Sequence, residues 1–203
     1  MRKLIFILLL LPFLAQAQES DNLEAPASVT QTRGPSPRLS YTAVGLSLMQ
    51  WNEPLRLEQS GGSTSDVANF NGTAITIERS TYFYRWGYSF SGMFASGRAN
   101  GGGTASLITY SETKMPWTMF GIMPRMYYRY TGRLNFGLTV PVVYKNISWP
   151  ESDTGVVADS GKKLNIFALG DMTLRLTGKL DLYQGIGPIG NGTFWQIGLA
   201  YRL

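Results

Sequence analysis

The stretch RLNFGLTVPVVYK, residues Arg133 to Lys145, alternates between two kinds of side chain with a period of two. One set is apolar or aromatic and comprises Leu134, Phe136, Leu138, Val140, Val142 and Tyr144. The other set is polar or small and comprises Arg133, Asn135, Gly137, Thr139, Pro141 and Lys145. Because successive side chains of a β-strand point to opposite faces, the alternation predicts a long strand with one apolar face.

A second run, Lys163 to Thr177, repeats the pattern, with Leu164, Ile166, Ala168, Met172, Leu174 and Leu176 opposing Lys163, Asn165, Asp171, Thr173 and Arg175. Strands of soluble domains cluster near about 5–6 residues, whereas a tilted strand needs about 9–11 to cross a bilayer. The length of these runs favours lipid outside and a polar interior. A soluble β-sandwich also alternates, but it does not explain strands of this length.

Two near-copies of one turn define the order of the strands: RYTGRLN at Arg129–Asn135 and RLTGKLD at Arg175–Asp181. Short turns of membrane barrels lie on the periplasmic side and long loops lie outside. Counting back from the C-terminus then gives eight strands, at Leu39–Trp51, Thr73–Arg79, Tyr82–Gly97, Trp117–Tyr130, Arg133–Ile147, Lys163–Thr177, Lys179–Gly187 and Thr193–Leu203. The predicted fold is an all-β, eight-stranded antiparallel up-and-down transmembrane β-barrel, with both termini in the periplasm. A ninth strand at Thr104–Glu112 would reverse this orientation, so we favour eight.

The N-terminus has the composition of an export signal. A basic start, an apolar run from Leu4 to Leu14 and the triplet Ala15-Gln16-Ala17 predict a secretory signal peptide at residues 1–17. Residues 18–38 are polar, rich in proline and without periodicity, which predicts a flexible periplasmic leader. The barrel is expected to occupy residues 39–203.

Aromatic residues are expected to form two belts at the membrane interfaces. The outer belt would contain Trp51, Trp117, Trp149 and Trp195, and the inner belt Trp86, Tyr128, Tyr130 and Tyr201. Between the strands, the outer loops 52–72, 98–116 and 148–162 are longer than closure requires, and long loops are often functional. An extracellular ligand is therefore a possible partner of these loops.

The whole stretch from Leu39 to Leu203 resembles the small outer-membrane β-barrels of Gram-negative bacteria, of the OmpA-transmembrane, OmpX and OmpW kind. The last strand carries the closest match, with Trp195, Ile197, Leu199, Tyr201 and Leu203 at every second position. The family usually ends in phenylalanine, where this chain has Leu203. The resemblance implies that these residues are an assembly signal read by the outer-membrane barrel assembly machinery. It also implies location in the cell outer membrane, with outer-membrane lipid and lipopolysaccharide as partners.

Charged residues at inward positions predict what the barrel interior contains. The expected lumen charge cluster comprises Glu78, Arg85, Arg125, Arg129, Asp171, Arg175 and Asp181, accompanied by Asn135, Gln196, Arg202 and the glycines 45, 121, 137, 185 and 198. The interior of an eight-stranded barrel is just wide enough to be filled by its own side chains. Unpaired buried charge is costly, so we expect these groups to pair as a polar plug. A narrow, weakly anion-favouring pore for small solutes is the alternative, because arginines outnumber carboxylates.

Composition removes several classes of function. The chain of 203 residues contains no cysteine and no histidine, which excludes thiol chemistry and removes the commonest general base and metal ligand. Enzymes of the resembled barrel class rely on a catalytic histidine, so we expect no enzymatic activity, no cofactor and no metal. With 18 basic and 13 acidic residues, charge does not suggest nucleic acid as a partner. The expected role is envelope-structural or surface interaction through the outer loops.

Overall fold

The computed structural model describes residues 39–59, 62–101, 115–147, 157–158, 162–190 and 192–203, and of these residues the side chains of 55–66, 101 and 157–158 are not described. The expected signal peptide and leader lie outside the described residues, as do Trp149 and most of the loops 98–116 and 148–162. Among the described residues, no helix is long and apolar enough to span a membrane.

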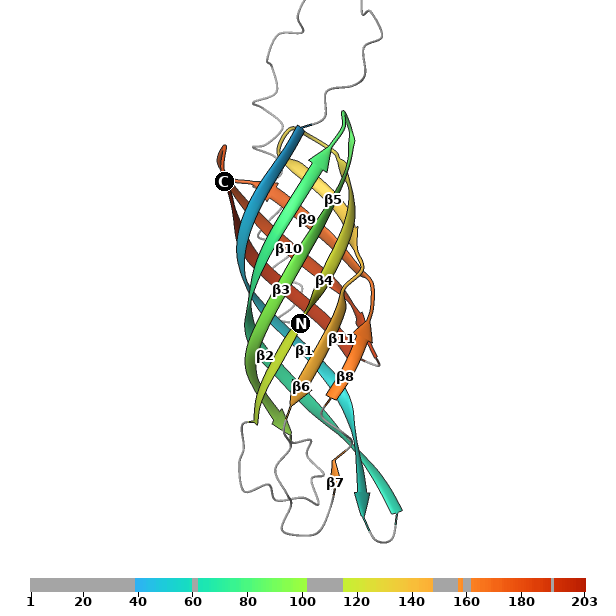
Figure 1. Cartoon of the computed structure of the whole chain (residues 1–203). Coiled ribbons are helices and arrows are strands. Elements are labelled where there is room, and N and C mark those ends of the chain that lie inside the picture. The colour runs from blue at the N-terminus through green and yellow to red at the C-terminus, as the bar shows by residue number, and fades with distance from the viewer. Residues whose placement is uncertain (1–38, 60–61, 102–114, 148–156, 159–161, 191) are drawn as a thin grey trace, which may run out of the picture.

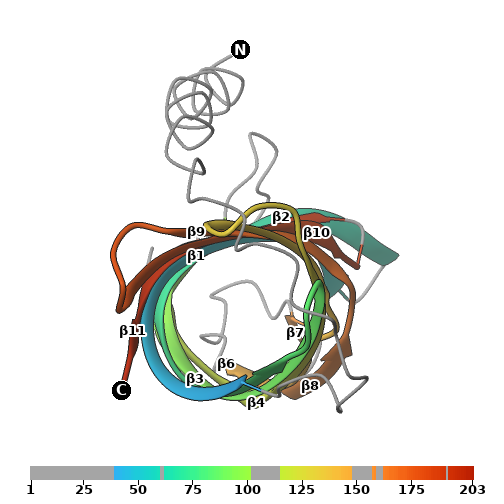
Figure 2. The ribbon, with the colours of Figure 1, turned by 90° about the horizontal axis from the view of Figure 1, so that it is seen from above.

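The described chain forms one closed antiparallel barrel (Figures 1 and 2). Its strands are β1 (Leu39–Gln59), β2 (Gly62–Tyr82), β3 (Trp86–Gly101), β4 (Met115–Arg129), β5 (Leu134–Thr139), β6 (Val142–Ile147), β7 (Val157–Ala158), β8 (Lys162–Ile166), β9 (Leu169–Arg175), β10 (Leu180–Ile189) and β11 (Gly192–Arg202). The first and last strands pair, from Ala43↔Arg202 to Gln50↔Trp195, and this pairing closes the barrel.

The wall contains eight strands, because two of them are interrupted at the same height. The β5 and β6 segments form one strand broken at Val140-Pro141, and β8 and β9 form its neighbour, broken at Phe167-Ala168. Pro141 has no N–H to donate to the ladder. At the break Val140 N–H donates to the Pro124 carbonyl at 2.9 Å, and Phe167 N–H donates to the Pro141 carbonyl at 3.3 Å. The predicted eight-stranded antiparallel barrel is confirmed.

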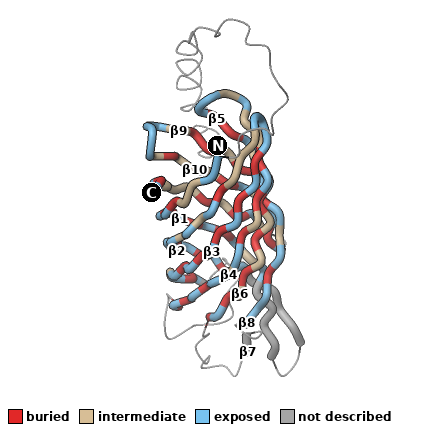
Figure 3. Tube along the Cα trace, turned by 45° about the horizontal axis from the view of Figure 1, so that its top comes forward, coloured by how far each residue is buried: buried red, intermediate tan, exposed pale blue. Residues whose placement is uncertain are grey.

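Buried and exposed residues alternate along the strands (Figure 3), because one set of side chains faces the lumen and the other faces outward. Outward residues such as Leu46, Ile77 and Ile166 are 60%, 61% and 65% exposed, although they are apolar. A soluble protein rarely exposes so much continuous apolar surface, whereas lipid contact requires it. The outer face therefore has the character expected of a membrane-spanning barrel.

We call the end of the barrel where β1 begins and β11 finishes the terminal end, and the opposite end the loop end. Three turns of described residues lie at the terminal end, at positions 83–85, 130–133 and 176–179 (Figure 1). The two Thr-Gly turns share one geometry. Thr131 Oγ1 accepts from the N–H groups of Arg133 and Leu134 at 3.2 and 3.0 Å, and Thr177 Oγ1 accepts from Lys179 and Leu180 at 3.3 and 3.1 Å. A threonine hydroxyl that fixes its own turn explains why the motif recurs.

Several predicted boundaries were wrong. Residues 52–72 are not a loop, because β1 and β2 continue as a hairpin to the pair Gln59↔Gly62. The hairpin projects past the barrel wall at the loop end, where Leu57↔Ala158 and Glu58↔Val157 add β7 to it (Figure 1). The second strand is thus much longer than Thr73–Arg79. The turn that follows it lies at residues 83–85, so β3 begins at Trp86 and not at Tyr82.

Candidate functional site

The candidate site is the barrel lumen, which consists of two layers of different chemistry. The half next to the terminal end is polar and charged, and we call it the polar layer. The half next to the loop end is filled by aromatic, methionine and small apolar side chains, and we call it the apolar layer.

The centre of the polar layer is an ion pair between Arg125 on β4 and Asp171 on β9. Arg125 Nε donates to Asp171 Oδ1 at 2.8 Å, and its Nη2 donates to the same oxygen. The side chains are 7% and 0% exposed. Two threonines complete the network, since Arg125 Nη2 donates to Thr173 Oγ1 at 2.8 Å and Thr139 Oγ1 donates to Asp171 Oδ2 at 2.8 Å. A buried pair of this kind is stable only when its remaining donors and acceptors are satisfied.

Gly137 leaves the space that this ion pair occupies. It lies on β5, between the two charged strands, opposite Asp171 and next to the β4 strand that carries Arg125. A Cβ atom at Gly137 would lie 2.6 Å from Asp171 Oδ1 and 2.8 Å from Arg125 Nε. Any larger residue would therefore displace the pair.

A second charged group lies closer to the terminal end and joins three neighbouring strands. Arg202 on β11 donates to Asp181 on β10, from Nε at 2.7 Å and with Nη2 at 2.6 Å from the same oxygen. Arg175 on β9 lies on the other side of Asp181, with Nε 3.7 Å from Oδ1. The guanidinium of Arg202 also lies 4.2 Å from the ring centroid of Tyr41. One carboxylate thus serves two arginines, so this part of the lumen carries excess positive charge.

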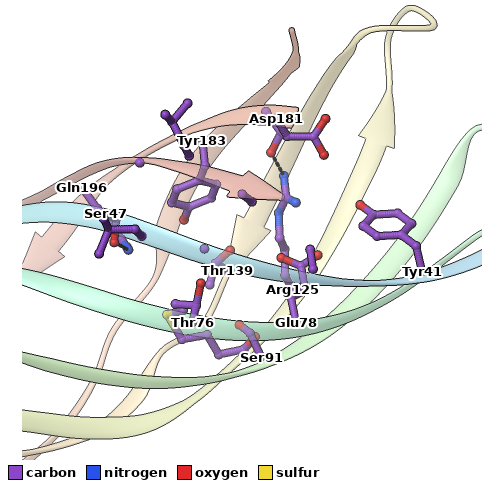
Figure 4. A pocket seen from close by; sticks show the side chains of 18 residues that line it. Tyr41, Ser47, Thr76, Glu78, Ser91, Arg125, Thr139, Asp181, Tyr183 and Gln196 are labelled. Carbon is purple, nitrogen blue, oxygen red and sulfur yellow. Dashed lines mark hydrogen bonds between the residues drawn. The ribbon is translucent and has the colours of Figure 1, made fainter. Parts of the chain in front are cut away.

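A small cavity of about 50 Å³ remains within the polar layer (Figure 4). Its charged and polar lining includes Tyr41, Glu78, Arg125, Asp181, Tyr183 and Gln196. Gln196 Nε2 donates to Ser47 Oγ at 2.6 Å, which ties β11 to β1 across the closing seam. The volume is enough for a few water molecules but not for a solute of metabolite size.

The apolar layer is built around four aromatic rings that pack together. Trp51 stacks on Phe70 with centroids 4.7 Å apart, meets Trp117 edge-on at 4.8 Å, and lies 5.7 Å from Phe194. Each of these side chains is at most 2% exposed. Methionines fill the surrounding space, at positions 49, 93, 115, 119 and 123. Gly72 lies directly beneath the Trp117 indole, and a Cβ atom there would overlap the ring. These side chains are packed against one another in this half of the lumen.

One ion pair lies within this apolar half. Lys145 Nζ on β6 lies 2.5 Å from Glu53 Oε2 on β1, and Trp51 Nε1 donates to Glu53 Oε1 at 2.9 Å. The ammonium group also lies 4.5 Å from the Phe70 ring centroid. Glu53 therefore anchors both the lysine and the central tryptophan of the layer.

The structure brings most of the expected charge cluster into the lumen, but in two groups. Arg125 and Asp171 form one, with Glu78 on the same cavity, and Arg175 and Asp181 form the other together with Arg202. Arg129 lies at the lumen mouth, 4.9 Å from the Tyr82 ring centroid. Arg85 does not belong to the cluster. It is exposed in the turn at 83–85, because β3 begins one residue later and no lumen surrounds it there.

The belt assignment of two tryptophans was also wrong. Trp51 and Trp117 face the lumen at 2% and 1% exposure, whereas Trp86, Tyr130 and Tyr201 are exposed on the outside. The sequence alone could have placed both tryptophans in the lumen, because residues an even number of positions apart on a strand share a face. Trp51 lies six positions from Gly45, and Trp117 lies four positions from Gly121, and both glycines were predicted to face inward. The position of these tryptophans near the strand ends suggested a belt, but the alternation decides which face they occupy.

The sequence did not indicate three further features of the lumen, namely Phe70, Glu53 and the role of Lys145. Phe70 and Glu53 lie in the segment 52–72, for which a loop was predicted. The final strand alternates as expected, with Phe194, Gln196 and Arg202 buried and Leu199, Tyr201 and Leu203 exposed. Its expected role as an assembly signal remains a prediction. Among the described residues no three acidic, histidine or cysteine side chains gather as they would to hold a metal.

The fold and the apolar outer face define a small, closed, eight-stranded β-barrel, the architecture of the outer-membrane proteins that the sequence resembles. No family model matches the chain, and no curated protein matches it by sequence. Solved structures similar to it include Ail, the attachment invasion locus protein of Yersinia pestis, at 14% identity and a TM-score of 0.46, covering 80% of this chain and 99% of that one. The structure of Neisserial surface protein A has 11% sequence identity and a TM-score of 0.39, and the match covers 80% of this chain and 96% of that one. An outer-membrane channel from Pseudomonas putida F1 has 9% sequence identity and a TM-score of 0.35, and the match covers 87% of this chain and 100% of that one.

Proposed function

We propose that this protein is a non-enzymatic outer-membrane β-barrel that acts at the cell surface, with its lumen closed by its own side chains. In this proposal the terminal end faces the periplasm and the loop end faces outward. The packed apolar layer carries the proposal, because Trp51, Phe70, Trp117 and Phe194 occupy the lumen where a solute would have to pass. The alternative, a narrow anion-favouring pore, is supported by the excess of arginine near the lumen mouth. It would need a water path past these four rings.

The projecting β1–β2 hairpin supports a role in surface interaction. The pairing of β1 with β11 stops at Gln50↔Trp195, and the pairing of β2 with β3 begins at Ala68↔Gly101. Beyond these points β1 and β2 pair with each other as far as Gln59↔Gly62, and β7 adds to the outer edge. Closure of the barrel does not require this extension. A hairpin that extends beyond the wall offers backbone to a partner.

Shortening the hairpin is expected to separate a surface role from a purely structural one. In the test variant a two-residue Asn-Gly turn replaces residues 55–66, which leaves every residue of the barrel wall in place. Cells that display the variant are expected to attach several-fold less to immobilised extracellular proteins, while their sensitivity to detergent stays at the level of the unaltered protein. Unchanged attachment together with a higher sensitivity to detergent would favour an envelope-structural role. No change in either property, with the variant folded in the membrane, would contradict the proposed function.

A further inference from the structure

The terminal end carries a set of exposed cations on the outside of the barrel. Arg85, Arg133 and Lys179 each lie in one of the three turns at this end, and Arg79 lies on the outward face of β2. We call these four residues the basic collar. All four are exposed, and none has a carboxylate oxygen within 4 Å among the described residues. The nearby Asp181 faces the lumen and already serves Arg175 and Arg202.

The collar lies at the height where the outer face changes from apolar to polar. On β1 and β2 the last outward apolar pair is Val44 and Ile77, both exposed. The next outward residues are Thr42 and Arg79, and Arg79 Nη1 donates to Thr42 Oγ1 at 2.9 Å. Beyond them Ser40 and Thr81 hydroxyls share a hydrogen bond at 3.0 Å. Arg79 therefore marks the edge of the apolar band.

Exposed aromatic rings lie beside the same cations. Tyr84, Trp86, Tyr130 and Tyr201 are 80%, 57%, 69% and 48% exposed. The guanidinium of Arg85 lies 5.6 Å from the Tyr84 centroid and donates to the Tyr128 hydroxyl at 3.3 Å, and Lys179 Nζ lies 5.6 Å from the Tyr201 centroid. Tryptophan and tyrosine on the outside of membrane proteins prefer the headgroup level. The rings beside the collar are therefore of the kind expected at the headgroup level.

The exposed charged side chains of the described residues are positive at both ends of the barrel: the basic collar at the terminal end, and Arg98, Lys162 and Lys163 at the loop end. The collar is distinguished by the exposed aromatic rings that lie beside Arg85 and Lys179.

From these observations we infer that the basic collar binds the phosphate groups of anionic phospholipids in the membrane leaflet around the terminal end. Arginine donates to phosphate in a paired geometry, and each cation close to an anionic surface adds attraction. Zwitterionic lipid presents the same phosphate but no net charge, so it should be held less firmly. The inference rests on the proposed placement of the barrel in a membrane and adds a partner at the end opposite the hairpin.

The test compares the full chain with two variants in bilayers of phosphatidylcholine that contain traces of spin-labelled lipid. Electron paramagnetic resonance gives the motionally restricted fraction of spin-labelled phosphatidylglycerol relative to spin-labelled phosphatidylcholine. The collar variant carries Arg79→Gln, Arg85→Gln, Arg133→Gln and Lys179→Gln. The matched control neutralises exposed cations at the loop end, with Arg98→Gln, Lys162→Gln and Lys163→Gln.

The unaltered protein is expected to prefer phosphatidylglycerol by about three- to tenfold. The preference should fall to about one in the collar variant, remain in the control, and weaken with added salt. A preference near one for the unaltered protein, or one lost only in the control, would overturn the inference. So would collar-dependent sedimentation with isolated peptidoglycan without any lipid preference.

Heat-dependent gel migration of the same samples reports whether each barrel has inserted and folded. If the unaltered barrel inserts but shows no preference for anionic lipid, the inference that the collar binds lipid is wrong, while the proposed function is unaffected. Failure of the unaltered protein to insert overturns both.

Discussion

Replacing Arg125 with methionine is expected to lower the free energy of unfolding by about 3 to 5 kcal/mol, measured by urea titration in phosphatidylcholine vesicles. The guanidinium makes hydrogen bonds to Asp171 and Thr173 inside the lumen. Its removal leaves the Asp171 carboxylate, whose side chain is 0% exposed, without a counter-charge. The Thr139 hydroxyl still donates to Asp171, but a single neutral donor does not replace a buried cation.

Two further variants show whether the lost charge causes the effect. Arg125→Met combined with Asp171→Asn should recover more than half of the lost stability, because no uncompensated charge then remains buried. Arg85→Met removes an arginine that is exposed in a turn, so the free energy of unfolding should change by no more than about 0.5 kcal/mol. Equal losses from Arg85→Met and Arg125→Met would mean that the polar layer does not depend on its ion pair.

Replacing Trp117 with alanine is expected to cost about 3 to 5 kcal/mol, because it removes a fully buried ring from the apolar layer. The indole packs edge-on against Trp51 and lies 6.3 Å from the Phe70 centroid. Gly72 provides the space beneath it, and rigid strands cannot close the void that its removal leaves.

Trp86 supplies the matched control for that change. It is 57% exposed on the outer face, so Trp86→Ala removes an interfacial ring without opening a cavity. Its cost should be clearly smaller than that of Trp117→Ala in the same urea titration. If the two variants lost equal stability, Trp117 would be a belt residue and the lumen would not be packed as described.

The membrane-spanning part of the fold could be predicted from the sequence because lipid imposes the alternation. Where Leu134 to Tyr144 cross the apolar band, each outward residue must be apolar. The β1–β2 hairpin was missed because residues 52–72 show no regular alternation of apolar and polar residues in the sequence, although their backbones pair.

The lumen was harder to predict, because its chemistry depends on register between distant strands. Lys145 and Glu53 are separated by 92 residues and lie on strands that are not neighbours, so no local spacing brings them together. Arg85 has the odd-numbered position expected of an inward residue on this strand. It lies in the turn at residues 83–85, however, outside the part of the barrel that encloses a lumen. The apolar layer also contradicts the expectation that inward means polar, because Trp51 and Trp117 fill space rather than contact lipid.

We infer that the apolar outer face contacts lipid while the packed lumen excludes water. Cysteine labelling can test both statements, because the sequence contains no cysteine of its own. Single cysteines at Phe94, Ala95 and Asn100 of β3 sample the outer face, the lumen and the exposed loop end. In vesicles, a water-soluble, membrane-impermeant thiol reagent applied to both sides should label Asn100→Cys rapidly and leave Phe94→Cys and Ala95→Cys unlabelled. Rapid labelling of Phe94→Cys would contradict a membrane-spanning barrel, and rapid labelling of Ala95→Cys would contradict a closed lumen.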